Sequence, residues 1–264
     1  MSNVLDITSR HNPRWQALRR LAREPAAYRQ VGEVWLSGEH LLQALGARGG
    51  RASEVVISQS AWEQPALRSL TTLAPRCLRL PDTLFAAIGD QPSTAGVAAV
   101  VATPTASALD PLAGSVVLDR LQDAGNVGSI LRSAAALGFA QVLALPGTAA
   151  LWSPKVLRAA MGAHFGLRLI ENADLSDLVA LQVPLLATSS HGGDLLHAQA
   201  LPWPCAWLFG HEGQGLAAEL QQRAARLVRI AQPGGEESLN VAAAAAICLH
   251  ASACSRPAQT SHGQ

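Results

Sequence analysis

Residues Ile230 to Val241 read IAQPGGEESLNV. They predict the end of an apolar strand, a glycine-rich loop, and then Ser-Leu-Asn at the start of an alanine-rich helix. Such a loop presents backbone N–H groups and two small polar side chains at a helix N-terminus, where they can hold a polar ligand. Ser238 is the expected N-cap and Asn240 lies just inside the helix. Leu239 is expected to be buried and to form the wall of an apolar pocket.

A second polar segment lies upstream, within Leu118 to Phe139, where Asn126-Val-Gly128 turns a predicted strand into a helix. Asn126 is the expected N-cap, and Arg132 is expected to point back toward the loop from the second turn. An ordinary capped helix with a surface arginine would explain each residue alone. Together they place an amide and a guanidinium at the C-terminal end of a strand, where α/β sheets bind ligands.

The third segment is the loop Leu208 to Leu216, LFGHEGQGL, which follows another predicted strand. Its glycines permit close backbone approach, but they match neither a dinucleotide-binding nor a P-loop fingerprint. No histidine stands four positions after His211, so the His-Glu pair is not a metalloprotease motif and no metal is expected. Glu212 is either solvated or orients a nearby cation.

The composition indicates a two-domain globular protein. The chain has 264 residues, 49% of them hydrophobic, which is ample for packed cores. Its four cysteines lie far apart, which favours reduced, buried thiols in a cytoplasmic protein. The N-terminus has no signal-peptide pattern, and the most apolar stretch, Val241 to Leu249, is too short to span a bilayer. No membrane role is expected.

Alternating strand and helix patterns predict an α/β protein. We expect one α/β domain over residues 1–103, a linker with two prolines over 104–112, and a second domain over 113–264. In the second domain, strands rich in Val, Leu and Ile without alternation predict a parallel sheet covered on both faces. Asn12-Pro13 is expected to start the first helix, as N-cap and first helical residue.

Positive charge gathers near the N-terminus, although the net charge is only +1. Arg14, Arg19 and Arg20 belong to an arginine stripe on the first predicted helix, and the planar guanidinium fork of arginine suits phosphate. A GC-rich genome would give the same preference for arginine over lysine, and a solvated helix face explains the stripe nearly as well.

In their order along the chain, the segments at Asn126–Arg132, Leu208–Leu216 and Ile230–Val241 resemble motifs 1, 2 and 3 of the SpoU (TrmH) family of RNA ribose 2′-O-methyltransferases. The resemblance runs from about Leu118 to the last helix and includes PKVLRAAMGA from Pro154. The first hundred or so residues resemble, less specifically, the small RNA-binding domain of many members. The chain departs from the family at Ala231-Gln232, where Pro-Met is usual, and one wall of the cofactor pocket changes.

The resemblance implies a C-terminal trefoil-knotted parallel-sheet methyltransferase domain and a small N-terminal α/β RNA-binding domain. It implies S-adenosylmethionine as cofactor, ribosomal or transfer RNA as substrate, and a homodimer in which the second subunit completes each active site. The residues that match the family's functional positions are, for catalysis, Asn126, Arg132, Glu212, Ser238 and Asn240, and, for the cofactor, Thr188, Gly210, Ile230 and Leu239. With RNA as the implied substrate, the candidate RNA contacts are Arg14, Arg19, Arg20, Lys155 and Arg158.

Arg132 is the family's candidate base for the ribose hydroxyl, but a guanidinium is effectively always protonated. Orientation of the hydroxyl, or a grip on the adjacent phosphate, is the alternative role. Asn126 would orient Arg132 or the ribose, and Glu212 would position Arg132.

Three other functions stay open from the sequence. The first is an RNA-binding or ribosome-associated protein without catalysis, which the intact motif residues disfavour. The second is a knotted methyltransferase that modifies a base nitrogen, which the Asn126 and Arg132 pair disfavours. The third is a doubly wound nucleotide-binding enzyme, which the missing GxGxxG fingerprint disfavours.

Overall fold

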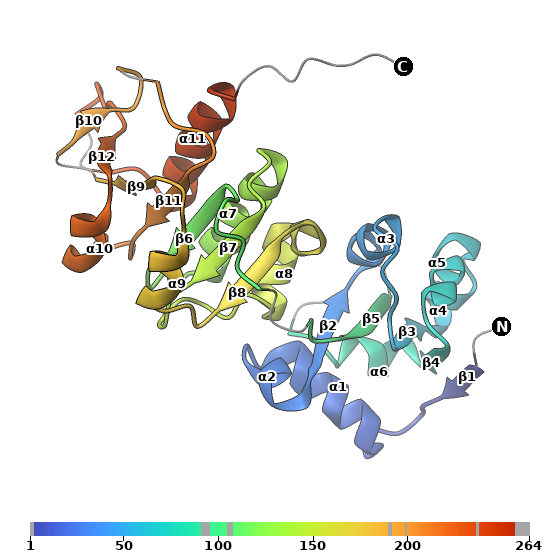
Figure 1. Cartoon of the computed structure of the whole chain (residues 1–264). Helices are drawn as coiled ribbons and strands as arrows, with labels where there is room; N and C mark the ends of the chain where they lie inside the picture. The colour runs from blue at the N-terminus through green and yellow to red at the C-terminus, as the bar shows by residue number, and fades with distance from the viewer. Residues whose placement is uncertain are drawn as a thin grey trace, which may run out of the picture. The chain divides into compact units, whose positions relative to one another are not determined.

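The computed structural model describes residues 3–90, 96–104, 108–189, 192–198, 200–235 and 238–256. The chain divides into two compact units (Figure 1). The first contains Met1–Thr105 together with Ala150–Gly166, and the second contains Ala106–Ala149 together with Leu167–Gln264. Part of the expected linker, residues 105–107, lies outside the described residues.

The first unit is built on a five-stranded sheet. Three strands run parallel, and the other two pair antiparallel. In spatial order the strands are β1 (Asn3–Asp6), β4 (Arg76–Leu80), β3 (Glu54–Ser58), β5 (Val97–Ala102) and β2 (Glu33–Ser37). The helices along the chain are α1 (Pro13–Arg23), α2 (Ala27–Val31), α3 (Glu39–Ala47), α4 (Gln59–Trp62), α5 (Pro65–Ser69), the 3-10 helix η1 (Leu70–Leu73), α6 (Asp82–Ala86), α8 (Pro154–Ala160) and the 3-10 helix η2 (Ala163–Gly166).

Helix α1 shows how local sequence fixes this unit. Asn12 is its N-cap and accepts hydrogen bonds from the N–H groups of Arg14 and Trp15, with Pro13 in the first turn, as predicted. Its apolar face, which includes Trp15 and Leu18, is buried in the core under the sheet. Helix α8 follows β7 in the chain but packs on α1 and β2 of this unit.

The second unit is built on a seven-stranded sheet in which every pair is parallel, as the apolar strand pattern predicted. In spatial order the strands are β10 (Asp194–Leu195), β12 (Arg226–Arg229), β9 (Leu185–Thr188), β11 (Ala206–Phe209), β6 (Ser115–Leu118), β7 (Gln141–Ala144) and β8 (Arg168–Glu171). The helices are α7 (Ala124–Ala136), α9 (Leu175–Ala180), α10 (Ala218–Arg223) and α11 (Val241–Cys254).

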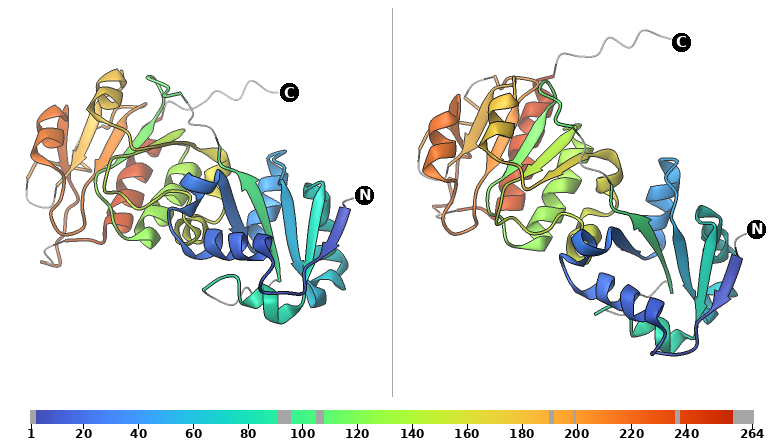
Figure 2. Two further views of the ribbon diagram at one scale, coloured as in Figure 1. Left: turned by 90° about the horizontal axis from the view of Figure 1, so that it is seen from below. Right: turned by 60° about the horizontal axis from the view of Figure 1, so that its bottom comes forward.

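The side chains of the central strand β11 alternate between the two faces of the sheet, and all four of its residues are buried because both faces are covered. Ala206 and Leu208 join the cluster that packs with α9 and α10. Trp207 points the other way, and its indole N–H donates to the Ser252 hydroxyl of α11 at 2.8 Å. Helix α11 also packs along α7, and Figure 2 shows these two helices next to each other on the sheet.

Two helix starts differ from the sequence prediction. The N-cap of α7 is Asp123, whose carboxylate accepts from the Asn126 N–H at 2.7 Å, so Asn126 lies in the first turn. The N-cap of α11 is Asn240, whose side chain accepts from Ala242 and Ala243, and not Ser238. Within the described residues, no helix is long and apolar enough to cross a membrane.

Candidate functional site

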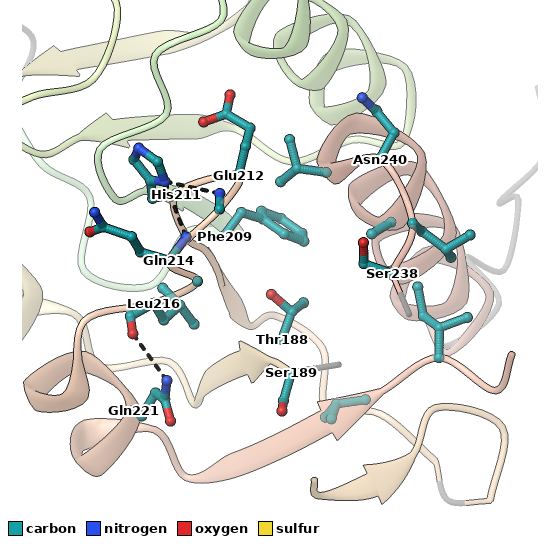
Figure 3. Close-up of a pocket in the computed structure, with 18 of the residues that line it drawn as sticks. Thr188, Ser189, Phe209, His211, Glu212, Gln214, Leu216, Gln221, Ser238 and Asn240 are labelled. Carbon is teal, nitrogen blue, oxygen red and sulfur yellow. Dashed lines mark hydrogen bonds between the residues drawn. The ribbon is translucent and has the colours of Figure 1, made fainter. Parts of the chain in front are cut away.

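A cavity of about 600 Å³ lies at the carboxyl ends of β9, β11 and β12 (Figure 3). In a parallel sheet all these ends lie on one edge, so the loops after the three strands meet there. The four residues predicted to contact a cofactor all line it: Thr188, Gly210, Ile230 and Leu239. Three of the predicted catalytic residues line it as well: Glu212, Ser238 and Asn240.

Leu239 differs from its prediction in one respect. Its side chain is 40% exposed, whereas we expected it to be buried. The residue lies in the loop before α11 and lines the cavity, and part of its surface is also exposed to solvent. Thr188 also lines the cavity, but its hydroxyl donates to the Leu208 carbonyl at 3.1 Å and helps join β9 to β11.

The loop over residues 210–216 is folded tightly on itself. A Cβ atom on Gly210 would lie 2.2 Å from the Leu216 nitrogen and 2.5 Å from the Gly215 oxygen, so only glycine fits there. The imidazole Nδ1 of His211 accepts from the N–H groups of Gly213 and Gln214 at 3.0 and 3.2 Å (Figure 3). His211 is therefore a cap inside this loop, a role that its position in the sequence did not reveal.

Glu212 joins this loop to the start of α7. Its carboxylate accepts from the backbone N–H groups of Asp123 and Gln122 at 3.2 and 3.4 Å, and from Asn126 Nδ2 at 3.3 Å. Desolvation raises the pKa of Glu212, but hydrogen bonds from its own N–H and from these three donors together lower it below its ordinary value of 4.5. Glu212 is thus held as a carboxylate.

Asn126 lies between Glu212 and Asn240. Its Oδ1 accepts from Asn240 Nδ2 at 3.0 Å, while its own amide donates to Glu212. The chain of hydrogen bonds Asn240–Asn126–Glu212 therefore connects all three polar segments of the sequence. This network was not predicted as such, although each of its members was.

Arg132 does not join the network. It is exposed and forms no hydrogen bond or ion pair with any residue that the structure describes. It follows Asn126 by six positions on α7, which places it about 120° around the helix from Asn126. The predicted contact in which Glu212 positions Arg132 is therefore absent in this chain, because Glu212 bonds to Asn126 and to the backbone before α7.

The arginines of α1 have different environments. Arg14 donates to Glu33 and to the buried Glu54, each at 2.8 Å, so its guanidinium is engaged in the protein and not free for phosphate. Arg20 bonds to Glu24 and Gln30. Arg19 lies over the Trp15 ring, 6.0 Å from its centroid.

Two further RNA candidates lie on α8, the helix that packs on α1. Lys155 is exposed and Arg158 is half-buried. Neither forms an ion pair within the described part of the chain, so both charges are available to a ligand. Both lie in the first unit, on a helix adjacent to the one that carries Arg19.

Comparison with known proteins identifies the family. The model of the SpoU rRNA Methylase family matches residues 114–250, which is more than half of the chain. The chain belongs to this family. An uncharacterized tRNA/rRNA methyltransferase of Synechocystis is 31% identical over 94% of this chain and 93% of its own length. The 23S rRNA (guanosine(2553)-2′-O)-methyltransferase RlmP of Bacillus subtilis is 28% identical over 81% of this chain and 86% of its own length.

Solved structures agree with this assignment to the SpoU family. An AdoMet-bound rRNA methyltransferase from Sinorhizobium meliloti superposes with a TM-score of 0.80 at 27% identity, covering 94% of this chain and 97% of that one. A structure described as an RNA 2′-O ribose methyltransferase gives the same TM-score at 28% identity, covering 95% and 99%. The α/β fold of both units is therefore that of SpoU proteins.

The cavity suits S-adenosylmethionine. Its volume is in the range of small-molecule sites, and its lining combines backbone at Gly210 with apolar side chains such as Ile230 and Leu239. Gln232, also in the lining, has a buried Oε1 without a hydrogen-bond partner among the described residues. A ligand rich in N–H and O–H groups offers donors to such an acceptor. No cluster that could hold a metal ion is found in the described ranges.

Proposed function

We propose that this protein transfers a methyl group from S-adenosylmethionine to a ribose 2′-hydroxyl of ribosomal or transfer RNA. As a SpoU-family member the chain is an RNA methyltransferase with this cofactor. The observation that carries the proposal is the cavity that gathers all four predicted cofactor residues at the edge of the parallel sheet. The Asn240–Asn126–Glu212 network runs beside it.

The cofactor supplies a methyl group already activated on a positively charged sulfur. The chain contributes position, because transfer of this kind needs the ribose oxygen in line with the methyl carbon. Backbone at Gly210 and the side chains of Ile230 and Leu239 form the cofactor wall. Ser238 and the Asn126–Asn240 pair lie where polar groups can hold the ribose or the cofactor.

We infer that Arg132 acts at the cavity of a second subunit in a homodimer. In its own chain it is exposed, unpaired within the described residues, and outside the cavity lining. Helix α11 packs along α7, which carries Arg132, and α11 leaves Ile247 42% exposed, an apolar residue suited to a subunit interface. There the guanidinium would orient the ribose hydroxyl or bind the adjacent phosphate while the proton leaves to that phosphate or to water.

The first unit would select the RNA. Arg19 on α1 and Lys155 and Arg158 on the adjacent α8 are the cations that we propose for phosphate contact. Arg14 is left out because Glu33 and Glu54 hold it. An RNA substrate and cysteines that are free in the structure support a cytoplasmic protein.

The RNA class can be tested with purified protein and S-adenosylmethionine that carries a labelled methyl group. Ribosomal RNA and transfer RNA from a strain that lacks the gene serve as separate substrates. Label that enters either RNA with the wild type and is lost with Arg132→Ala supports the proposal. The absence of label in both, with the cofactor bound, would favour a non-catalytic RNA-binding protein.

A further inference from the structure

We propose that Asp119 and Arg120 are positioning residues that hold the glycine-rich loop 210–217 in its cofactor-binding form. The inference rests on the proposed function. Neither side chain lines the cavity, and both follow directly after the end of β6 at Leu118. The sequence offered one signal for them, a charged Asp-Arg pair immediately after a buried apolar strand.

The backbone at Arg120 is unusual. Its φ is +57°, in the left-handed region, and among the described non-glycine residues only Met161 and Asn172 share this conformation. A side chain with a Cβ atom disfavours that region, and such residues cluster where a site requires them. The left-handed turn brings the Arg120 side chain back onto its own neighbour Asp119, with Nε to Oδ1 at 2.8 Å and Nη2 to Oδ2 at 3.0 Å.

The paired side chains then bind the loop at three points. Arg120 Nη1 donates to Gln214 Oε1 at 3.1 Å, and Nη2 donates to the Gly215 carbonyl at 3.4 Å. The buried Asp119 accepts from the Ala217 N–H at 2.9 Å. The bidentate pair with Asp119 fixes the guanidinium so that its remaining donors face the loop.

These contacts act on the cavity wall. Gln214, Gly215 and Leu216 all line the cavity, and backbone atoms of Gly215 and Leu216 lie so near Gly210 that they leave no room for a Cβ atom there. A shift of the loop at Gly215 therefore moves the wall at Gly210, the predicted cofactor contact. Arg120 can change cofactor affinity in this way without touching the cofactor.

Calorimetric titration of S-adenosylhomocysteine into the full chain tests the inference. We expect Arg120→Ala to lower affinity about tenfold or more, because charge-assisted hydrogen bonds to the loop are lost. Arg120→Lys should not restore it, since an ammonium cannot form the same fork. Arg168→Ala is the matched control. Arg168 lies on the edge strand β8 and pairs with Asp110. Its side chain is 35% exposed, as is that of Arg120.

Arg120→Gly separates positioning from folding. Glycine relieves the left-handed strain, so we expect a thermal midpoint equal to or above that of Arg120→Ala, with affinity as weak. Gln214→Ala, on the exposed loop, should weaken binding, and adding it to Arg120→Ala should cost less than the sum of the two. This double-mutant cycle keeps the test valid if one of the single variants folds poorly.

The outcomes are distinct. If the wild type binds S-adenosylhomocysteine and Arg120→Ala binds within twofold of it, the positioning role is wrong and the proposed function stands. If affinity and thermal midpoint fall together in all Arg120 variants, including Arg120→Gly, the residue is structural and the inference is overturned. A wild type that binds neither this compound nor S-adenosylmethionine removes the proposed function together with the inference.

Discussion

Asn240 Nδ2 donates a 3.0 Å hydrogen bond to Oδ1 of Asn126, a residue 114 positions earlier in the chain. Asn240 is at the same time the N-cap of α11, because its Oδ1 accepts from Ala242 and Ala243. The side-chain amide of Asn240 therefore caps the last helix with its oxygen and donates a hydrogen bond to Asn126 with its nitrogen.

This dual use can be separated by mutation. Asn240→Asp keeps the capping oxygen but loses the donor to Asn126, so we expect nearly wild-type stability and a loss of methyl transfer on the order of 10²-fold. Asn240→Ala should lose activity and also about 1 kcal/mol of unfolding free energy. Chemical denaturation beside single-turnover methylation measures both; equal activity of Asn240→Asp and wild type would contradict the role of the network.

Gly210→Ala tests the tight loop. The added Cβ would lie 2.2 Å from the Leu216 nitrogen, so the loop must move and cofactor binding should be lost. Gly213→Ala in the same loop is the control, since its nearest neighbour would be a His211 ring atom at 3.8 Å. Calorimetry with S-adenosylhomocysteine distinguishes them; similar affinities of the two variants would show that Gly210 does not shape the site.

Glu212 predicts a pH dependence. Its pKa is lowered in the folded protein from the ordinary value of 4.5, so its carboxylate stabilises the loop above pH 4.5. That contribution is lost as pH falls through the lowered pKa. We expect the wild type to unfold at a higher temperature than Glu212→Gln above about pH 5 and the difference to shrink toward pH 3. A difference in unfolding temperature that grows as the pH falls would contradict a lowered pKa of Glu212 in the folded protein.

The cysteines should differ in reactivity. Burial raises the pKa of Cys77 and Cys205 to about 11 and that of Cys248 to about 12, whereas Cys254 is exposed. A thiol reagent at pH 8 should therefore modify one thiol in the native protein and all four in denaturant. Rapid modification of Cys248 would show that α11 leaves its site against the sheet.

Arg132 tests the dimer. Mixing Arg132→Ala, which has an intact cavity, with Gly210→Ala, which has an intact Arg132, should restore activity if Arg132 serves the partner subunit. Random pairing gives about a quarter of wild-type activity per chain. Unmixed variants are the controls. If Arg132 acts in its own chain, the mixture stays as inactive as its components.

Much of the second unit could be predicted because its strands are continuous apolar runs. SVVL at β6 and AWLF at β11 are short apolar runs bounded by turn residues, a pattern typical of buried strands in a parallel sheet. Helix starts were harder. Each of these helices has two competent N-caps within three residues of each other: Asp123 and Asn126 for α7, and Ser238 and Asn240 for α11. Tertiary hydrogen bonds select between the two candidates.

Local sequence patterns also did not predict features that depend on contacts between residues far apart in the chain. The two-residue β10 and the edge strand β1, with every residue exposed, carry no apolar periodicity. Arg14 appeared to belong to a basic stripe because Glu33 and Glu54 lie far away in the chain. The trefoil knot was inferred from the family resemblance alone and stays a prediction.

The most direct test of the account is the chemical position of the methyl group. Purified protein, S-adenosylmethionine and the RNA that accepts label would be incubated, and the RNA digested to nucleosides for mass spectrometry. We predict a nucleoside methylated on the ribose 2′-oxygen with the wild type and none with Arg132→Ala. A methyl group on a base nitrogen would contradict the account.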